Sequence, residues 1–178
     1  MIHLISITGP SAKHFYLEEE CTSDFKSLMR TVTSGRVMIV STKFRSDLFY
    51  SAEKAQNEAI LKLWALYGKV ELRQSPDNGI ATFTGREASF SNYFLSINKL
   101  SLTWHFYRLY QRTFCQTFND DQHNPITLIV AGIDQHLMKH PSIKREALLD
   151  SNIAVKPTLT EDTFSLAMYI INSETHAN

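Results

Sequence analysis

The sequence of 178 residues has no excess of charge of either sign. Lysine and arginine together number 18, and aspartate and glutamate also number 18. Domains that coat nucleic acid are usually basic overall, so this balance argues against that class of protein. It still permits a small basic patch on a neutral surface. The length suits one domain, which we expect to span residues 1–178 with a frayed tail over 173–178.

Cysteine is scarce, and long apolar runs are missing. Cys21 and Cys115 stand far apart and match no zinc or redox spacing, which predicts free thiols in a reducing, cytoplasmic compartment. No apolar run reaches the roughly 18 residues that a membrane-spanning helix needs, so we expect no membrane partner. The start, MIHLISITGPS, lacks a basic region and predicts no signal peptide.

Catalytic signatures are also missing. The chain has no GxxxxGK[ST], GxGxxG, GxSxG or HExxH motif, which predicts a protein that is not an enzyme and needs no cofactor. His136 and His140 are four residues apart and would share a helix face, where they could hold a metal ion. A third ligand at a recognised spacing is lacking, so we expect no metal site. The acidic and histidine residues that keep a metal-dependent hydrolase as an alternative are Asp120, Asp121, His123, Asp134, His136 and His140.

The hydrophobic pattern predicts an α+β fold that is mostly helical, with a few short strands. The predicted strands are Ile2–Ile7, Arg36–Lys43 and a hairpin of Lys69–Gln74 with Gly79–Thr84. The region 126–131 fits either a short strand or the start of a buried helix. The predicted helices are Ser23–Val32, Ala52–Tyr67, Ile133–Lys139, Pro141–Leu149 and a last one that includes Phe164 to Ile170.

The segment Phe90–Phe114 has the densest aromatic content in the chain and contains no proline or glycine. These features predict one long helix. Apolar residues recur at steps of three and four and form two stripes. The first consists of Tyr93, Ile97, Leu100, Trp104 and Tyr107, and the second of Phe94, Leu95, Leu102, Phe106 and Leu109. Two stripes indicate partners on two sides, so the helix is expected in the core or in the contact between two subunits.

Two short segments have the alternation that a DNA-reading strand needs. Such a strand presents hydrogen-bonding side chains at every second position to the major groove, with apolar residues between them. An arginine or lysine favours guanine, and a threonine methyl can contact thymine. A solvated sheet face alternates in the same way and is the alternative. The residues that we assign to DNA binding are Ser41, Lys43 and Arg45 in the first segment, and Thr82, Thr84 and Arg86 in the second.

The segments VMIVSTKFRSDLFYS and FSNYFLSINKLSLTWHFYR resemble parts of proteins encoded by conjugative plasmids and integrative conjugative elements. Some of these proteins are similar to ribbon-helix-helix transcriptional regulators. The resemblance implies a ribbon-helix-helix-like homodimer that reads double-stranded DNA through paired strands. This chain is longer than a minimal ribbon-helix-helix unit, because each strand is followed by a long helix and further chain.

The function predicted from the sequence is a cytoplasmic, homo-oligomeric DNA-binding transcriptional regulator of a mobile genetic element. A protein-protein interaction module, such as an adaptor or inhibitor without DNA binding, is the second hypothesis, because neutral charge and many aromatic residues suit it equally well. A metal-dependent hydrolase is the third. The neutral charge of the sequence as a whole does not decide among them, because the surface distribution of charge depends on the fold.

Overall fold

A computed structural model describes residues 1–68 and 79–139, which form an α+β fold of helices and one antiparallel sheet. The contacts between Cα atoms divide the chain into two compact units, Met1–Ser89 and Phe90–Asn178. We call them the sheet unit and the helical unit, and describe each by itself. The expectation of one domain over 1–178, with a tail at 173–178, stays a prediction. The predicted arm at 69–74, the helix at 141–149 and the helix through 164–170 lie outside the described residues.

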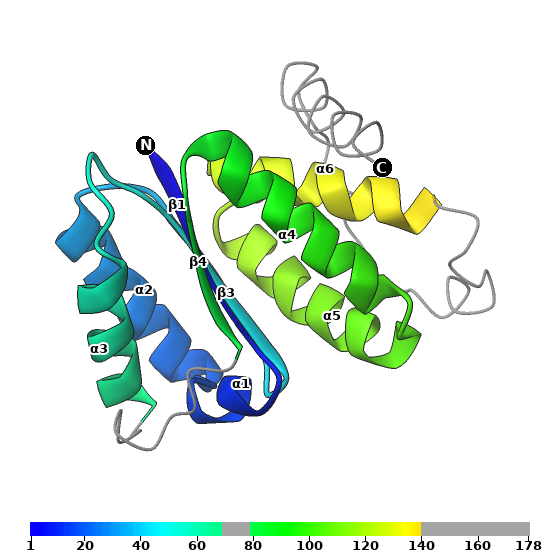
Figure 1. Cartoon of the computed structure of the whole chain (residues 1–178), viewed down its shortest axis with the longest axis horizontal. Helices are drawn as coiled ribbons and strands as arrows, with labels where there is room; N and C mark the ends of the chain where they lie inside the picture. The colour runs from blue at the N-terminus through cyan, green and yellow to red at the C-terminus, as the bar shows by residue number, and fades with distance from the viewer. Residues whose placement is uncertain (69–78, 140–178) are drawn as a thin grey trace. The chain divides into compact units, whose positions relative to one another are not determined.

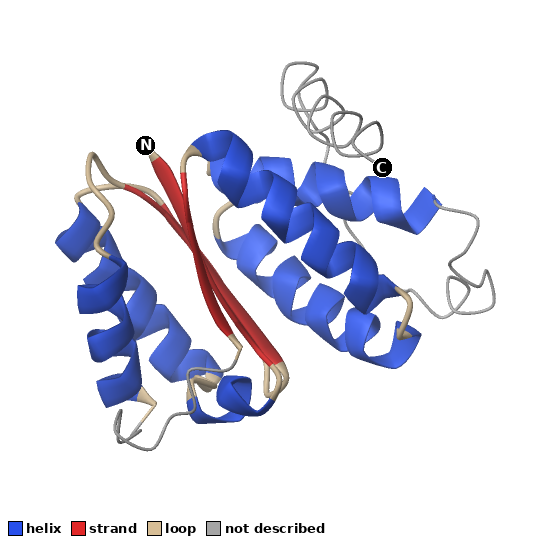
Figure 2. Cartoon of the chain, in the orientation of Figure 1, coloured by secondary structure: helices blue, strands red, loops and turns tan. Residues whose placement is uncertain are grey.

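The sheet unit has four strands in the spatial order β2-β3-β1-β4, and every neighbouring pair is antiparallel. The short helix α1 and then α2 follow β1 in the chain, and α3 follows β3. The strands and the two longer helices therefore have the order βαββαβ, which is a split βαβ, or ferredoxin-like, topology. Both helices lie on the same side of the sheet (Figures 1 and 2). The elements are β1 (Ile2–Thr8), α1 (Pro10–His14), α2 (Glu19–Thr33), β2 (Val37–Ser41), β3 (Arg45–Ser51), α3 (Asn57–Tyr67) and β4 (Ile80–Thr84).

The core of the sheet unit lies between the sheet and these helices. Trp64 of α3 is fully buried, contacts Phe15 and Phe25 through its ring, and donates its indole N–H to the carbonyl oxygen of Phe15 at 2.9 Å. Alternate residues of β1, β2 and β3 complete this core, as the period of two in a strand requires. They are Ile5, Ile7, Val37, Ile39, Leu48 and Tyr50.

The first predicted DNA-reading strand is wrong in its extent. The predicted strand Arg36–Lys43 would have placed Arg45 on the face of Ser41 and Lys43 if the chain stayed extended. The strand instead ends at Ser41, and the chain reverses into β3. The side chain of Thr42 closes this turn, because its hydroxyl donates to the carbonyl oxygen of Arg45 at 2.6 Å and accepts from the amide of Arg45 at 3.1 Å. Ser41, Lys43 and Arg45 therefore do not form one face of one strand.

The remaining strands and helices of the sheet unit match the predictions in part. The strand at 2–7 is confirmed as β1, and the strand at 79–84 is confirmed as β4, which pairs with β1. Helix α2 begins four residues before the predicted start, and α3 begins at Asn57 rather than Ala52. The sheet topology does not confirm the ribbon-helix-helix arrangement, in which a strand and two helices make up the unit.

The helices of the helical unit have other boundaries than the sequence pattern predicted. The predicted single helix over Phe90–Phe114 is wrong, because α4 ends at Ser101 and α5 begins at Trp104. The hydroxyl of Ser101 donates to the carbonyl oxygen of Asn98 at 2.6 Å, which satisfies an acceptor at the end of α4 without glycine or proline. The region 126–131 lies in a helix, which confirms the second of its two predicted alternatives, the start of a buried helix. The elements are α4 (Arg86–Ser101, whose first residues belong to the sheet unit), α5 (Trp104–Asp120) and α6 (Pro125–Lys139).

Each helix in residues 1–68 and 79–139 is too short or too polar to cross a lipid bilayer.

Candidate functional site

Ser41 is positioned by the core of the sheet unit. It lies at the end of β2 and is 5% exposed. Its hydroxyl accepts the backbone N–H of Leu17 at 3.0 Å and lies 3.2 Å from the hydroxyl of Ser46. These contacts connect β2 to the segment before α2 and to β3. The structure therefore gives this predicted DNA contact a role in holding the sheet unit together.

Arg45 is paired within the fold. Its Nε and Nη2 atoms donate to the two carboxylate oxygens of Asp47 at 2.6 and 3.0 Å, a bidentate geometry in which arginine binds carboxylate strongly. Ser6 of β1 donates to Oδ1 of Asp47 at 2.7 Å. The Arg45 and Asp47 side chains are 4% and 0% exposed. Because the pair is buried, the positive charge of Arg45 interacts with Asp47 inside the protein rather than with a ligand at the surface.

Lys43 is exposed, in the turn between β2 and β3. Its ammonium nitrogen lies 5.5 Å from the centre of the Tyr16 ring, a distance at which a cation is attracted to the face of an aromatic ring. Of the first predicted set, Lys43 is thus the residue that solvent reaches. A single lysine supplies one phosphate contact and carries little sequence information.

The second predicted set lies at the edge of the sheet. Thr82 and Thr84 are exposed on β4, and Nδ1 of His3 lies 3.3 Å from the hydroxyl oxygen of Thr84. Gly85 follows with a φ of 101°, a conformation that suits glycine, and Arg86 then begins α4. The threonines share one face of β4, but Arg86 is the first residue of a helix and does not continue the alternation.

Sequence reasoning assigned no function to a row of basic side chains on α5, although the pattern placed Arg108 on a solvent-facing side. His105, Arg108 and Arg112 are spaced by three and four residues, which places them on one side of the helix. His105 and Arg112 are exposed, and Arg108 is partly exposed. Exposed Lys99 of α4 adds a fourth basic residue near the turn between the two helices. We call His105, Arg108 and Arg112 the basic row.

The basic row lies in a part of the chain without acidic residues. Between Glu87 and Asp120 the sequence contains no aspartate or glutamate. Asp120 stands eight residues after Arg112, or about 12 Å along a helix that rises 1.5 Å per residue. The acidic residues that flank this stretch are Glu87 in the first turn of α4 and Asp120 at the end of α5. This signal is present in the sequence, but its meaning depends on knowing which face of α5 is exposed.

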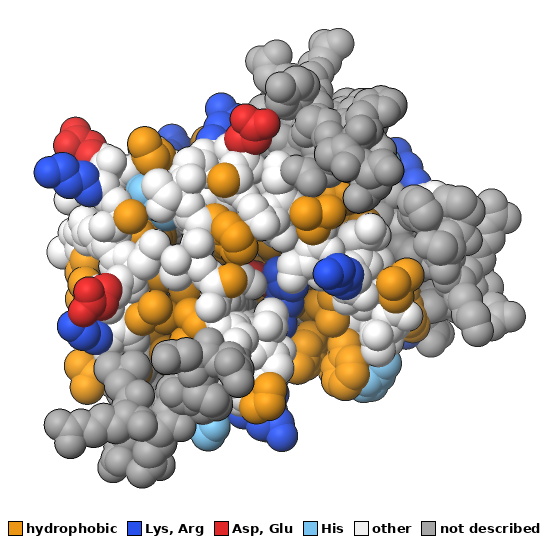
Figure 3. Space-filling view, in the orientation of Figure 1, with side chains coloured by type: hydrophobic (Ala, Val, Ile, Leu, Met, Phe, Trp, Pro, Cys, Tyr) orange, Lys and Arg blue, Asp and Glu red, His pale blue; other side chains and the backbone are white. Residues whose placement is uncertain are grey.

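Hydrophobic side chains line the same exposed side of the hairpin. Leu102 in the turn is 74% exposed, and Phe106 and Leu109 of α5 are 43% and 39% exposed. They follow each other at spacings of four and three residues, next to the basic row. Leu95 of α4 is 39% exposed as well. Figure 3 shows hydrophobic, histidine and basic side chains gathered at the lower right, over α4 and α5. We call Leu102, Phe106 and Leu109 the apolar stripe.

A buried polar cluster holds α5 and α6 together behind this surface. The hydroxyl of Tyr107 donates to Oδ1 of Asp134 at 2.6 Å, and the amide nitrogen of Gln111 donates to Oδ2 at 3.1 Å. Burial raises the pKa of Asp134 above its ordinary value, although both hydrogen bonds act in the opposite direction. Burial, helped by the negative charge of Asp134, raises the pKa of Cys115 to about 11. Perturbed groups of this kind are found at active sites and also in structural networks.

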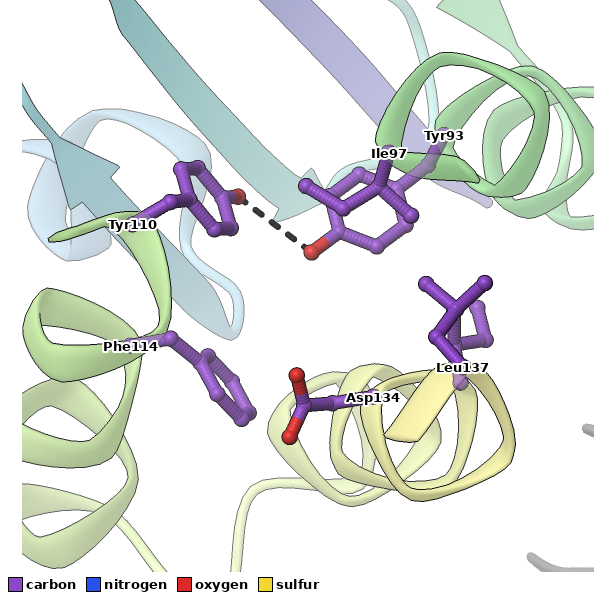
Figure 4. Close-up of a pocket in the computed structure, with 7 residues that line it drawn as sticks. Tyr93, Ile97, Tyr110, Phe114, Asp134 and Leu137 are labelled. Atoms are coloured by element: carbon purple, nitrogen blue, oxygen red, sulfur yellow. Dashed lines mark hydrogen bonds between the residues drawn. The ribbon is translucent and has the colours of Figure 1, made fainter. Parts of the chain in front are cut away.

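The space beside Asp134 is small and mostly apolar (Figure 4). Asp134 points from α6 toward residues of α4 and α5, and the hydroxyl of Tyr93 donates to that of Tyr110 at 3.3 Å. This indentation has no room for a water molecule, so it does not suit a substrate. Its lining consists of Tyr93, Ile97, Tyr110, Phe114, Ile133, Asp134 and Leu137. We interpret the cluster as the means by which the helices of this unit are fixed in place.

The acidic and histidine residues considered for a metal do not come together where they are described. Within residues 1–68 and 79–139, no three histidine, cysteine or acidic side chains are grouped closely enough to hold a metal ion. Asp134 is bound by Tyr107 and Gln111, whereas the ring of His136 lies edge-on to Phe94 with centres 6.3 Å apart. His140 lies outside the described residues.

No family model, curated protein or solved structure matches the chain.

Proposed function

We propose that this protein is a cytoplasmic, homo-oligomeric DNA-binding regulator that contacts double-stranded DNA through the basic row on α5. The observation that carries the proposal is the exposed row of His105, Arg108 and Arg112, in a stretch of the chain, residues 88–119, that contains no acidic residue. Phosphate contacts from lysine and arginine supply most of the affinity of such proteins for DNA. A regulatory role on a mobile genetic element follows from the sequence resemblance alone.

The dimensions of the basic row suit a DNA backbone. Seven residues separate His105 from Arg112, which corresponds to about 10 Å along the helix axis. Successive phosphates of one strand rise about 3.4 Å along the duplex, so the row spans roughly three phosphate steps. Gln116 is exposed one helical turn after Arg112. A glutamine side chain can form two hydrogen bonds to adenine, so Gln116 is our candidate for contact with a base edge.

The proposal moves the main contact away from the residues predicted first. Ser41 and Arg45 have internal hydrogen-bond partners at 2.6 to 3.2 Å, which favours structural roles for them. Lys43, with Thr82, Thr84 and Arg86, stays a second candidate surface, because these side chains are exposed in the sheet unit. The function proposed is binding rather than catalysis, and it requires no cofactor.

The test is the affinity of the purified protein for random-sequence duplex DNA over a series of salt concentrations. For the wild type we expect affinity to fall steeply as salt rises, because bound phosphates release counterions. Replacing Arg108→Ala together with Arg112→Ala removes two such contacts. It should lower affinity at least tenfold at low salt and reduce the slope of log affinity against log salt by about 1.8, at about 0.9 per phosphate.

The matched control is Lys54→Ala with Lys62→Ala, which removes two positive charges from exposed positions of the sheet unit. Its affinity and salt slope should equal those of the wild type. An equal loss in both double variants would contradict the proposal, since binding would then follow net charge rather than the basic row. Absence of binding by the wild type at low salt would contradict it as well.

A protein-protein interaction module is the second candidate function, and the exposed apolar stripe favours it. Leu102, the most exposed of these residues, has 74% of its surface accessible. Side chains of this size that gather on one surface are typical of sites where another protein docks. Capture of one protein partner at a fixed ratio, in the absence of DNA binding, would support this function over the first.

A further inference from the structure

We propose that the apolar stripe is the contact between two copies of this chain, which pair their α5 helices antiparallel and present both basic rows to one DNA duplex. This inference rests on the proposed function, because DNA is what brings the two copies together. It starts from the position of the basic row, which borders one side of the stripe on α5. The helix buries its other side through residues such as Tyr107, Tyr110 and Phe114.

The symmetry of an antiparallel contact decides where the two rows lie. A two-fold axis that lies in the contact plane and is perpendicular to α5 reverses the direction of the helix. Under this rotation, the residues that border one edge of the stripe in one copy lie on the same side of the dimer as the equivalent residues of the second copy. The two basic rows are then neighbours on one surface. A parallel pairing would place them on opposite sides, where a single duplex could not contact both. The antiparallel pairing also matches the two-fold symmetry that dimeric DNA-binding proteins share with their sites.

The size of the stripe indicates that this contact is weak in the absence of DNA. Four partly exposed side chains, the stripe and Leu95, offer roughly a few hundred Å² per copy, which is the size of a single surface patch. A stable interface between proteins buries about 1,200 Å² or more in total. The four arginine charges of the paired rows also repel each other. Because DNA neutralises these charges, we expect the second copy to bind cooperatively on DNA.

The experiment titrates the full-length protein onto a duplex of about 20 base pairs, two helical turns. The wild type should bind with a Hill coefficient near 2. The variant Leu102→Gln with Leu109→Gln should bind with a coefficient near 1 and with an unchanged salt slope per bound copy. Both leucines are exposed, so this variant should keep the wild-type circular dichroism spectrum. The control is Leu66→Gln, because Leu66 is 73% exposed in the sheet unit, and it should retain the cooperativity.

A second arm distinguishes failure of this inference from failure of the proposed function. Sedimentation equilibrium without DNA at about 1 M salt, where the screening length is about 3 Å, should show reversible dimers of the wild type and monomers of the double leucine variant. DNA binding without cooperativity, with a monomer in this arm, would overturn the dimer and leave the proposed function standing. Dimers that depend on the leucines, in a protein that binds no DNA, would support the stripe contact and overturn its role on DNA.

Discussion

The two units of the chain treat their charged side chains in opposite ways. In the sheet unit, Arg45 and Asp47 form a bidentate ion pair whose side chains are at most 4% exposed. In the helical unit, the basic row of α5 faces solvent, and the nearest acidic residue along that helix is Asp120. A buried pair contributes to holding one structure, whereas a row of basic side chains at the surface creates a positive potential that attracts anions. A chain with no net charge therefore has one arginine whose charge is paired inside the fold and a row of basic side chains at its surface.

This difference shows why overall charge is a poor guide to function in this chain. The 18 basic and 18 acidic residues balance in the sequence. The acidic residues are absent from the segment between Glu87 and Asp120, so the balance does not hold locally. Screening by salt acts over about 8 Å at physiological ionic strength, which makes the local balance the one that a bound phosphate experiences.

The largest expected effect in this comparison comes from breaking the buried pair. Asp47→Ala should lower the free energy of unfolding by about 3–5 kcal/mol, because it leaves Arg45 buried without its partner and removes the acceptor of Ser6. Urea denaturation followed by circular dichroism measures this loss. Replacing both partners, Arg45→Met with Asp47→Leu, should cost much less, because no unpaired charge is then left inside the protein.

An exposed ion pair in the same unit supplies the control. Lys62 and Glu58 lie one helical turn apart on α3, with nitrogen and oxygen 2.6 Å apart and side chains 61% and 85% exposed. Glu58→Ala should leave the urea midpoint unchanged, because solvent screens such a pair. Equal effects of Asp47→Ala and Glu58→Ala would show that the Arg45–Asp47 pair does not stabilise the fold through its burial.

The next effect concerns pH and the helical unit. Burial raises the pKa of Asp134 in the folded protein above its ordinary value. The folded state therefore binds more protons than the unfolded state in the range between these two pKa values. The contribution of this group to stability is complete below the ordinary pKa and is lost as the pH rises through the folded pKa. Asp134→Asn, which does not titrate, should remove this part of the pH dependence, which sets in as the pH rises above about 4, the ordinary pKa of an aspartate.

The measurement is the free energy of unfolding of the wild type and Asp134→Asn at several pH values. The difference between the two proteins should change with pH in the direction that favours the asparagine variant at neutral pH. The amide keeps an oxygen that can accept the hydroxyl of Tyr107. A difference that is constant over this range would contradict the raised pKa of Asp134.

The smallest effect compares one thiol from each unit. Cys21 is exposed on α2, whereas Cys115 on α5 is partly buried and has a pKa of about 11. Thiolate is the reactive form, so near pH 8 the Cys115 thiol should be alkylated roughly 100-fold more slowly than a thiol of ordinary pKa. Iodoacetamide labelling followed by peptide mass spectrometry should find Cys21 modified long before Cys115. Similar rates at the two positions would contradict the raised pKa of Cys115.

Alternation and helix punctuation were sufficient to predict β1, β4 and most of α2, since their residues follow simple hydrophobic patterns. The segment Arg45–Ser51 was missed as a strand, because its buried face contains Arg45 and Asp47. Such residues enter a core only as a compensated pair, and the pairing is a property of the fold. Treating Arg45 as exposed led directly to the first predicted DNA site.

The break between α4 and α5 had a different cause. Leu102 and Thr103 interrupt the helix without glycine or proline, and Ser101 satisfies the end of α4 with its own side chain. In one continuous helix, each residue of α5 would lie on a face that is defined by the residues of α4 at the same helical spacing. The sequence pattern did predict a second apolar stripe that includes Leu102, Phe106 and Leu109, but it expected that stripe to be covered by a partner. The exposure of these side chains and of the basic row follows only when α5 is treated as a separate helix with its own buried side. This explains why sequence reasoning found the aromatic residues but not the exposed surface.

The most direct test of the central claim is to map the amide chemical shifts of the protein by nuclear magnetic resonance during titration with a short DNA duplex. The account predicts that the largest changes fall on residues 99–116, around the basic row. The amides of the turn at Lys43 and of β4 should change little. Changes concentrated at Lys43, Thr82, Thr84 and Arg86, with α5 unaffected, would contradict the assignment of DNA binding to the helical unit.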